Sequence, residues 1–330
     1  MIGRAIYDVS DPVRPQLICR FENTAAHLNS ADSFTYLRAA PNNETAVVLH
    51  PMARGSESVI GSIPLASPSW GGYVAWTPDG KEAATTTLSS DSDGFQRIHV
   101  WLYSQRSSTQ LYSFLQPLTD CVCRFGLPRP MLDFSADGQY LVSGWPIGKG
   151  ATPGVVWRVA NPARVATLDG TDSVVAWDGV GHRLFVSGMS GSRTWTPEGG
   201  FVTLKGAKQW PFEPGVAPGG TQVAYTAFVD NGIPTSLRVW MYDAPSDTTR
   251  LLIDSLRSEV VFVKSGWVWY REEATCDPAT CGAPWGTQPT SSVYAMNLSN
   301  GVERSVYFIP GQSPWALDSG WGPAELWPGS

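Results

Sequence analysis

The sequence predicts an all-β fold: a seven-bladed β-propeller of four-stranded antiparallel blades, built as one domain over residues 1–330. Three observations carry this prediction: the composition, a repeated β-hairpin pattern, and its recurrence at steps of about 40 to 60 residues. The chain contains 33 Gly, 26 Pro and 15 Trp, and only 16% of its residues are charged. This mixture is poor in helix formers and rich in turn and strand residues, so strands joined by tight turns are expected.

The repeated hairpin is clearest at residues 131–145, MLDFSADGQYLVSGW. Leu132 and Phe134 alternate with polar residues, an Ala-Asp-Gly turn follows at 136–138, and residues 140–142 supply the return strand. Alternation with period two around an Asp-Gly pair is the strongest local hairpin signal.

The chain begins in the middle of this pattern. Residues 6–21 predict two strands with a turn at Ser10-Asp11-Pro12, and a polar loop that contains His27 and Asp32 follows. Residues 34–50 then predict the first inner hairpin. Further inner hairpins follow along the chain, so that seven are expected, starting near Phe34, Tyr73, Met131, Ser173, Gly215, Val260 and Trp315.

The two ends of the chain are expected to complete one blade. The N-terminus supplies only an outer pair of strands and the C-terminus, residues 315–327, only an inner pair. We therefore predict that Ile6–Val9 or Leu17–Phe21 lies outside the strand that holds Glu325–Trp327. Such a closure would join both chain ends in one sheet. The alternative is a stack of irregular sheets with a frayed end.

The turn sequences resemble those of a known family. TPDGKEAA from Thr77, SADGQYLVSG from Ser135 and APGGTQVAY from Ala217 are similar to the Ser-Pro-Asp-Gly-Lys repeats of TolB-like and WD-repeat-like propellers. The resemblance covers nearly the whole chain, but 178–181 and 264–266 lack the Pro-Asp pair. It implies a propeller from a family of binding modules, peptidase accessory domains and exported proteins, and it implies no reaction.

Charge and hydropathy narrow the classes of partner. The net charge is −6, and the 23 Lys and Arg residues are scattered singly, so no basic surface for nucleic acid is expected. No apolar run approaches the roughly 20 residues of a membrane helix, and no signal peptide or anchor is visible. The sequence leaves the oligomeric state open.

The cysteines point to an oxidising compartment. The chain has five, Cys19, Cys121, Cys123, Cys276 and Cys281. The CDPATC segment lies in a polar, Pro-rich region and predicts a Cys276–Cys281 disulfide, with free thiols as the alternative. A zinc site would need further Cys or His at zinc spacing. Cys19 could pair with Cys121 or Cys123. With disulfides formed, the protein is expected to be extracellular or periplasmic.

The longest connections should open on one face of the propeller, which we call the long-loop face. They are residues 22–33, 89–97, 116–130, 146–153, 205–214, 229–235 and 271–291. Loops of this length are commonly functional. These segments or their borders carry Trp145, Trp210 and Trp285, and with Asp32 and Asp120 these residues form the predicted binding surface for a protein, peptide or glycan. The alternative is that the indole rings only cover blade edges.

An enzymatic alternative is a propeller hydrolase of the esterase, lactonase or phosphotriesterase type. Propeller channels can gather carboxylates around Ca²⁺, which would be the cofactor of such an enzyme. Asp32, Asp120, Asp172 and Glu213 precede inner strands, and His27 is a candidate base. No spacing singles these residues out, and no nucleophile or phosphate-loop motif is present. A binding or scaffolding propeller is therefore the first prediction.

Overall fold

A computed structural model describes a large part of the chain. The described residues are 3–22, 26–30, 33–41, 44–51, 56–63, 74–90, 96–104, 107–115, 131–145, 152–170, 172–178, 181–188, 191–204, 212–217, 220–229, 237–264, 266–277 and 287–308. Their regular elements are β-strands, β1 to β26.

The strands form seven antiparallel sheets in chain order. The first contains β1 (Gly3–Asp8) and β2 (Gln16–Glu22). The second contains β3 (Ala26–Ser30), β4 (Ser33–Ala40), β5 (Glu44–Pro51) and β6 (Ser58–Ile63). The third contains β7 (Val74–Trp76), β8 (Glu82–Ser90), β9 (Gln96–Ser104) and β10 (Ser107–Leu115).

The remaining four sheets repeat the same up-and-down order. They are β11 (Met131–Phe134), β12 (Tyr140–Trp145), β13 (Thr152–Arg158) and β14 (Ala163–Thr167); β15 (Asp172–Trp177), β16 (Leu184–Gly188), β17 (Gly191–Thr196) and β18 (Gly200–Thr203); β19 (Phe212–Val216), β20 (Gln222–Phe228), β21 (Leu237–Asp243) and β22 (Thr248–Ile253); and β23 (Arg257–Lys264), β24 (Trp267–Thr275), β25 (Thr287–Asn297) and β26 (Glu303–Ser305).

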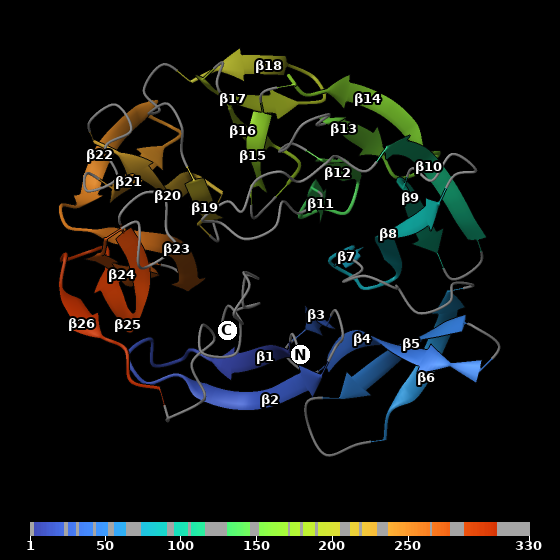
Figure 1. The fold of residues 1–330 in the computed structure, drawn as a ribbon, viewed down its shortest axis with the longest axis horizontal. Coiled ribbons are helices and arrows are strands. Elements are labelled where there is room, and N and C mark those ends of the chain that lie inside the picture. The colour runs from blue at the N-terminus through green and yellow to red at the C-terminus, as the bar shows by residue number, and fades with distance from the viewer. Residues whose placement is uncertain are drawn as a thin grey trace.

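The sheets stand around a common centre. The first strand of each four-stranded sheet lies innermost and the fourth lies at the rim (Figure 1). This arrangement fits a β-propeller and confirms the all-β, antiparallel, four-stranded prediction. The first sheet has two strands among the described residues, and both Trp315 and Glu325–Trp327 lie outside them. The count of seven complete blades and the strand closure therefore stay predictions.

The first four-stranded sheet corrects the predicted hairpin at 34–50. That hairpin is β4 paired with β5, the middle of the sheet, and the innermost strand is β3. His27, expected in a loop, lies in β3 opposite Thr35. The sequence AHLNS of β3 holds only two apolar residues in alternation, too few for the periodic pattern to stand out.

Asp-Gly turns close the inner hairpins on what we call the turn face, which is opposite the long-loop face. Ser135 donates its hydroxyl to Asp137 Oδ1 at 2.6 Å, and the Gln139 amide donates to the same oxygen at 3.0 Å. Thr77 donates to Asp79 Oδ1 in the same way at 2.8 Å. Gly138 has φ of 70°, a left-handed conformation that glycine adopts without strain. The turn motif thus has the structural role that the sequence predicted.

Tryptophans on the third strands form a second repeat, which the turn-based sequence analysis missed. They are Trp101, Trp157, Trp195 and Trp240, in the segments HVWLY, VVWRV, RTWTP and RVWMY. Trp157 stacks on Tyr112 of the preceding sheet with ring centroids 5.4 Å apart, and Trp195 meets Tyr140 edge-on at 5.5 Å. These indoles join neighbouring blades. In each of these segments Val or Thr precedes Trp, and this recurrence was the pattern that sequence analysis could have used.

The first and last described sheets also pack together. Tyr7 and Val9 share a buried cluster with Trp269 and Val293. The Trp269 Nε1–H donates to the Pro12 carbonyl at 2.8 Å, and the Tyr307 amide donates to the Val13 carbonyl at 2.9 Å. The two ends of the described chain are therefore in direct contact, which brings the sheets round into a ring.

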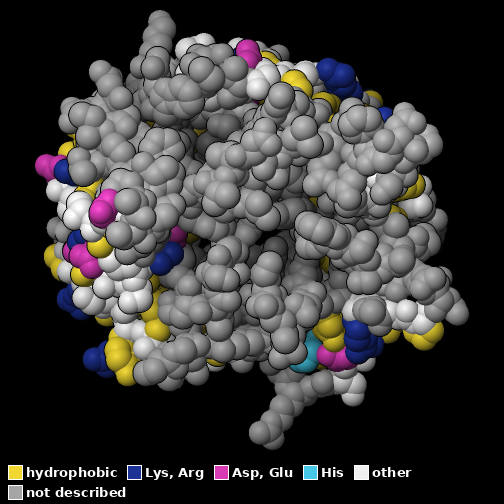
Figure 2. Space-filling model, viewed as in Figure 1, with side chains coloured by type: hydrophobic (Ala, Val, Ile, Leu, Met, Phe, Trp, Pro, Cys, Tyr) yellow, Lys and Arg dark blue, Asp and Glu magenta, His cyan; other side chains and the backbone are white. Residues whose placement is uncertain are grey.

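The rim is a mixed surface. Among the described residues, most exposed large hydrophobic side chains lie on or next to fourth strands, including Val59 (59% exposed), Val165, Val202 and Leu251. Figure 2 shows such side chains interspersed with charged ones around the circumference. Hydrophobic side chains that are scattered in this way are normal on soluble proteins.

Candidate functional site

The strongest polar site on the long-loop face is at the start of β15. Asp172 is the first residue of this innermost strand and is fully buried. Its Oδ2 accepts the Asp169 amide at 2.6 Å and forms an ion pair with Arg193 Nη2 from β17. The Arg193 guanidinium lies over the Phe201 ring, 5.0 Å from the centroid. Three strands of one blade therefore hold this charge pair in place.

The Asp172–Arg193 pair is incompletely satisfied. Asp172 Oδ1 and Arg193 Nε are buried and have no hydrogen-bond partner among the residues that the structure describes. Burial raises the pKa of Asp172, and the attraction of Arg193 offsets this only in part. A buried polar atom without a partner costs free energy, so such atoms are uncommon and each one needs an explanation.

We expect Arg193→Met to lower the free energy of unfolding at pH 7 by about 3 kcal/mol, because it leaves the Asp172 carboxylate buried without a counter-charge. The loss should shrink as the pH falls, because the raised pKa lets Asp172 become neutral first. Urea denaturation at pH 7 and pH 5 measures both effects. The charge-free double variant Asp172→Asn/Arg193→Met should recover most of the loss; no recovery would contradict this account.

A second charged cluster lies near the start of β23, another innermost strand. Glu259 is 8% exposed and has φ of 55°, a left-handed conformation that is strained for a residue with a side chain. Arg271 Nη1 contacts both carboxylate oxygens of Glu259, at 3.0 and 3.1 Å. Its other nitrogens donate to the Thr290 carbonyl at 2.7 and 3.0 Å. The ion pair therefore fixes the strained residue.

The strand around Glu259 is bulged. The pairing of β23 with β24 shifts between Ser258 and Val261, and the Ser258 hydroxyl donates to the buried carboxylate of Glu273. On the neighbouring inner strand, a Cβ at Gly215 would lie 3.1 Å from the Val260 carbonyl oxygen. The innermost strands β19 and β23 therefore approach closely at this point. Bulges of this kind commonly re-aim side chains next to functional sites.

The structure places the predicted site residues unevenly. Asp172, predicted to precede an inner strand, is the first residue of the innermost strand β15. Glu213 lies inside β19 and not before it. Trp145 is the last residue of β12, paired with Thr152, and not a loop residue as predicted, because β12 continues past the close pair Gly144 and Gly154. The side chains of Glu213, Trp145 and His27 lie outside the described set.

Several predicted residues lie outside the described residues altogether. They are Asp32, Asp120, Trp210, Trp285 and Cys281. Cys276 is disulfide-bonded, and its predicted pairing with Cys281 stays a prediction. The predicted loop 271–291 is shorter than expected, because β24 runs to Thr275 and β25 begins at Thr287.

Sequence reasoning missed Arg193, Glu259 and Arg271. They lie inside β17, β23 and β24, and the last two strands carry other charged residues, so no local pattern singled these three out. Within the described ranges, no group of three or more His, Cys, Asp or Glu side chains is arranged to hold a metal ion. In the same residues, no helix has the length and hydropathy needed to cross a membrane.

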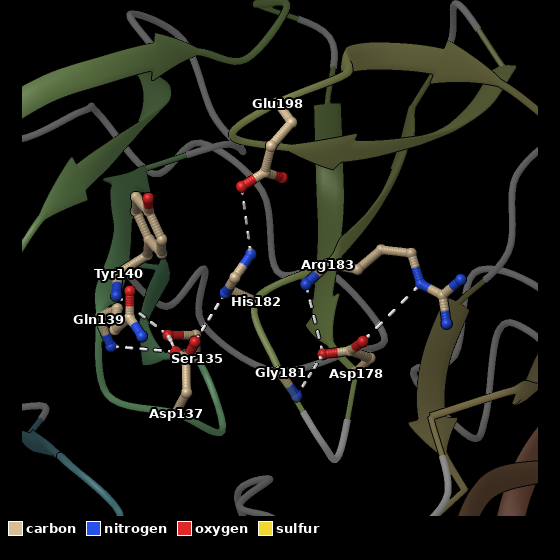
Figure 3. Close-up of polar contacts among 9 residues, drawn as sticks. All are labelled: Ser135, Asp137, Gln139, Tyr140, Asp178, Gly181, His182, Arg183 and Glu198. Carbon is tan, nitrogen blue, oxygen red and sulfur yellow. Dashed lines mark hydrogen bonds and ion pairs between the residues drawn. The ribbon is translucent and has the colours of Figure 1, made fainter.

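A third polar cluster lies on the turn face, between two blades (Figure 3). His182 Nδ1 is 2.6 Å from Asp137 Oδ2 of the preceding blade, and its Nε2 is 3.9 Å from Glu198 Oε1. Arg183 donates to the Gly220 carbonyl of the following blade at 2.7 Å. Burial alone would raise the pKa of Asp137, but hydrogen bonds from Ser135, His182 and the Gln139 amide lower it overall.

Comparison with known proteins identifies the fold. No protein-family model matches the chain, and neither does any curated protein. Acylaminoacyl peptidase from Pyrococcus horikoshii is similar in structure, with 10% sequence identity and a TM-score of 0.56 over 92% of this chain and 48% of that chain. A prolyl endopeptidase structure shows 12% identity and a TM-score of 0.51 over 90% and 46% of the two chains.

TolB from Acinetobacter baumannii aligns over 92% of this chain and 62% of its own, with 12% identity and a TM-score of 0.42. This chain spans about half the length of the two peptidase structures. At such identities, the likeness to the two peptidases establishes the fold alone, and the chain has a propeller scaffold.

Proposed function

We propose that this propeller is an exported binding or scaffolding protein that recognises a protein or peptide partner through its long-loop face. The observation that carries the proposal is the Asp172–Arg193 pair, a buried charge pair with unsatisfied polar atoms at the long-loop end of an innermost strand. Such a pair costs stability and is not needed to fold a blade, so a role in recognition accounts for it.

Two further observations support this proposal. The Glu259–Arg271 pair lies at the same end of a second innermost strand, so this face holds two largely buried charge pairs. The two peptidases match this chain with TM-scores above 0.5, and in each the matching part is less than half of the peptidase's own chain. A propeller therefore accompanies other parts of those proteins, and a scaffold role for this chain has a parallel there.

The extracellular or periplasmic location stays part of the proposal and rests on the disulfide at Cys276. The hydrolase alternative receives no such support. Asp172 is fully buried and paired with Arg193, whereas a general base must lie within reach of its substrate.

Substitution of the predicted aromatic anchors tests the binding face. Trp210→Ala and Trp285→Ala should each weaken partner binding by about 30-fold, because buried Trp anchors contribute about 2 kcal/mol or more at an interface. A peptide array with a parallel glycan array identifies a probe, and titration calorimetry with that probe measures the affinities. If the glycan array identifies the probe, the partner class in this proposal becomes a glycan instead of a protein or peptide.

The matched control lies on the turn face. Asp79 accepts the Thr77 hydroxyl and the Lys81 amide, so Asp79→Asn should lower the melting temperature and leave the affinity unchanged. If affinity instead falls with Asp79→Asn and not with the Trp variants, the partner binds the turn face and the proposal is wrong.

A further inference from the structure

The junction between the blade β11–β14 and the blade β15–β18 contains a histidine between two carboxylates (Figure 3). Asp137 lies in the β11–β12 turn, His182 lies in the β15–β16 turn, and Glu198 lies in the β17–β18 turn. Only Asp137 comes from the neighbouring blade. The cluster lies on the turn face, at the opposite end of the strands from the partner surface proposed above.

Asp137 is held ready for the imidazole. Its Oδ1 accepts the Ser135 hydroxyl and the Gln139 amide, at 2.6 and 3.0 Å, which leaves Oδ2 for His182. The Asp137 amide also donates to the Gly181 carbonyl across the same junction, at 3.4 Å. Because Asp137 accepts, His182 Nδ1 carries the proton in this contact.

The second ring nitrogen makes the contact sensitive to protonation. His182 Nε2 is 3.9 Å from Glu198 Oε1, too far for a hydrogen bond and within range for an ion pair. A neutral imidazole presents a lone pair to this carboxylate. A protonated imidazole presents an N–H and a positive charge, and it also strengthens the bond to Asp137.

The other groups around the imidazole do not cancel this effect. The Tyr140 ring lies edge-on to it at 5.3 Å. Arg183, the nearest described cation in the chain, is directed toward Asp178 and the Gly220 carbonyl, away from His182 (Figure 3). Asp178 in turn accepts the Gly181 amide at 3.0 Å. The charges that face His182 from the adjoining turns are therefore both negative.

We propose that His182 is a proton-sensitive clasp between these two blades, tight when its imidazole is a cation and looser when it is neutral. Protonation would place an N–H and a positive charge between the two carboxylates, and this is the change to which the clasp responds.

At low pH, protonation of the Asp137 carboxylate limits how strongly the two blades are held together. The lowered pKa of this carboxyl means that its contribution is complete above the unfolded value, about 3.9, and is lost as the pH falls through the folded value. The junction should therefore be tightest at mildly acidic pH.

Histidine NMR tests the clasp directly, because the chain has four histidines and His182→Gln identifies the signal. Glu198→Gln removes one facing charge, and since Glu198 is 77% exposed the fold should be preserved. The titration midpoint of His182 should fall by about 0.2–0.7 pH unit in this variant. The midpoint of His99, whose Nε2 contacts the Ser89 hydroxyl, should not move and serves as the control.

Stability provides the second readout. His182→Gln should lower the melting temperature more at pH 5.5 than at pH 8, because glutamine keeps a donor and cannot take up a proton. Equal losses at both pH values, or a His182 midpoint that stays the same in Glu198→Gln, would overturn the clasp and leave His182 with a packing role only.

Discussion

Replacing Trp269 by alanine is expected to lower the free energy of unfolding by about 4 kcal/mol, since truncation of a fully buried aromatic residue typically costs 3–5 kcal/mol. Trp269 in β24 has no exposed surface and packs edge-on against Phe308, with ring centroids 5.6 Å apart. It belongs to the cluster that also contains Tyr7 and Val9 from the first sheet. The variant therefore leaves a cavity where the first and last described sheets pack together.

The loss has two parts that a conservative variant separates. Trp269→Phe keeps most of the packing and removes the hydrogen bond to the Pro12 carbonyl, so it should cost about 1 kcal/mol from the lost bond. Chemical denaturation measures both variants. Tyr307→Ala is the control, because the Tyr307 amide bonds to the Val13 carbonyl at the same junction but the residue is 64% exposed. An alanine effect below about 1 kcal/mol would show that this junction contributes little to stability.

Gly144→Ala should lower the free energy of unfolding by about 3 kcal/mol, the upper part of the usual range for overpacking. A Cβ at this position would lie 2.6 Å from Gly154 Cα and 2.9 Å from Gly154 N. Both are backbone atoms, so no change of rotamer relieves the overlap. The register of β12 with β13 shifts at this point, between Ser143 and Trp145. The variant would force these two strands apart.

Gly61→Ala is the matched control within a strand. A Cβ there would lie 3.9 Å from Val47 Cβ, an ordinary contact distance. Alanine is favoured over glycine in strand interiors by roughly 0.5–1 kcal/mol, so this variant should be neutral or slightly stabilising. Thermal unfolding of both variants checks the contrast. Similar melting temperatures for the two would mean that the Gly144–Gly154 approach relaxes without cost.

The sequence alone determined the hairpins, because their signals are local. The Ser135-Ala136-Asp137-Gly138 turn is specified by a side-chain hydrogen bond between residues two apart and by one left-handed glycine. Alternation with period two then decides which side chains of β11 and β12 share a face. These local signals can be read from the sequence without knowing how the neighbouring blade packs. Among the described residues these signals missed β3, which holds only two apolar residues in alternation.

The sequence could not determine which strand ends remain paired. Trp145 was assigned to a loop because a Pro and Gly-rich segment follows it, yet Gly144 and Gly154 let β12 and β13 come close and continue pairing. Strand ends depend on whether a partner strand is present to accept the hydrogen bonds. The partner becomes visible only in the folded chain.

Only the tertiary structure decided how charges are paired. Asp172 and Arg193 meet across three strands of one blade, and Asp137 meets His182 across the junction of two blades. Neither partnership leaves a pattern in the sequence, because it depends on register, on bulges and on the rotation of one sheet against the next. The hairpins follow from contacts between near neighbours in the chain, whereas the sites follow from contacts that exist only when the blades stand side by side.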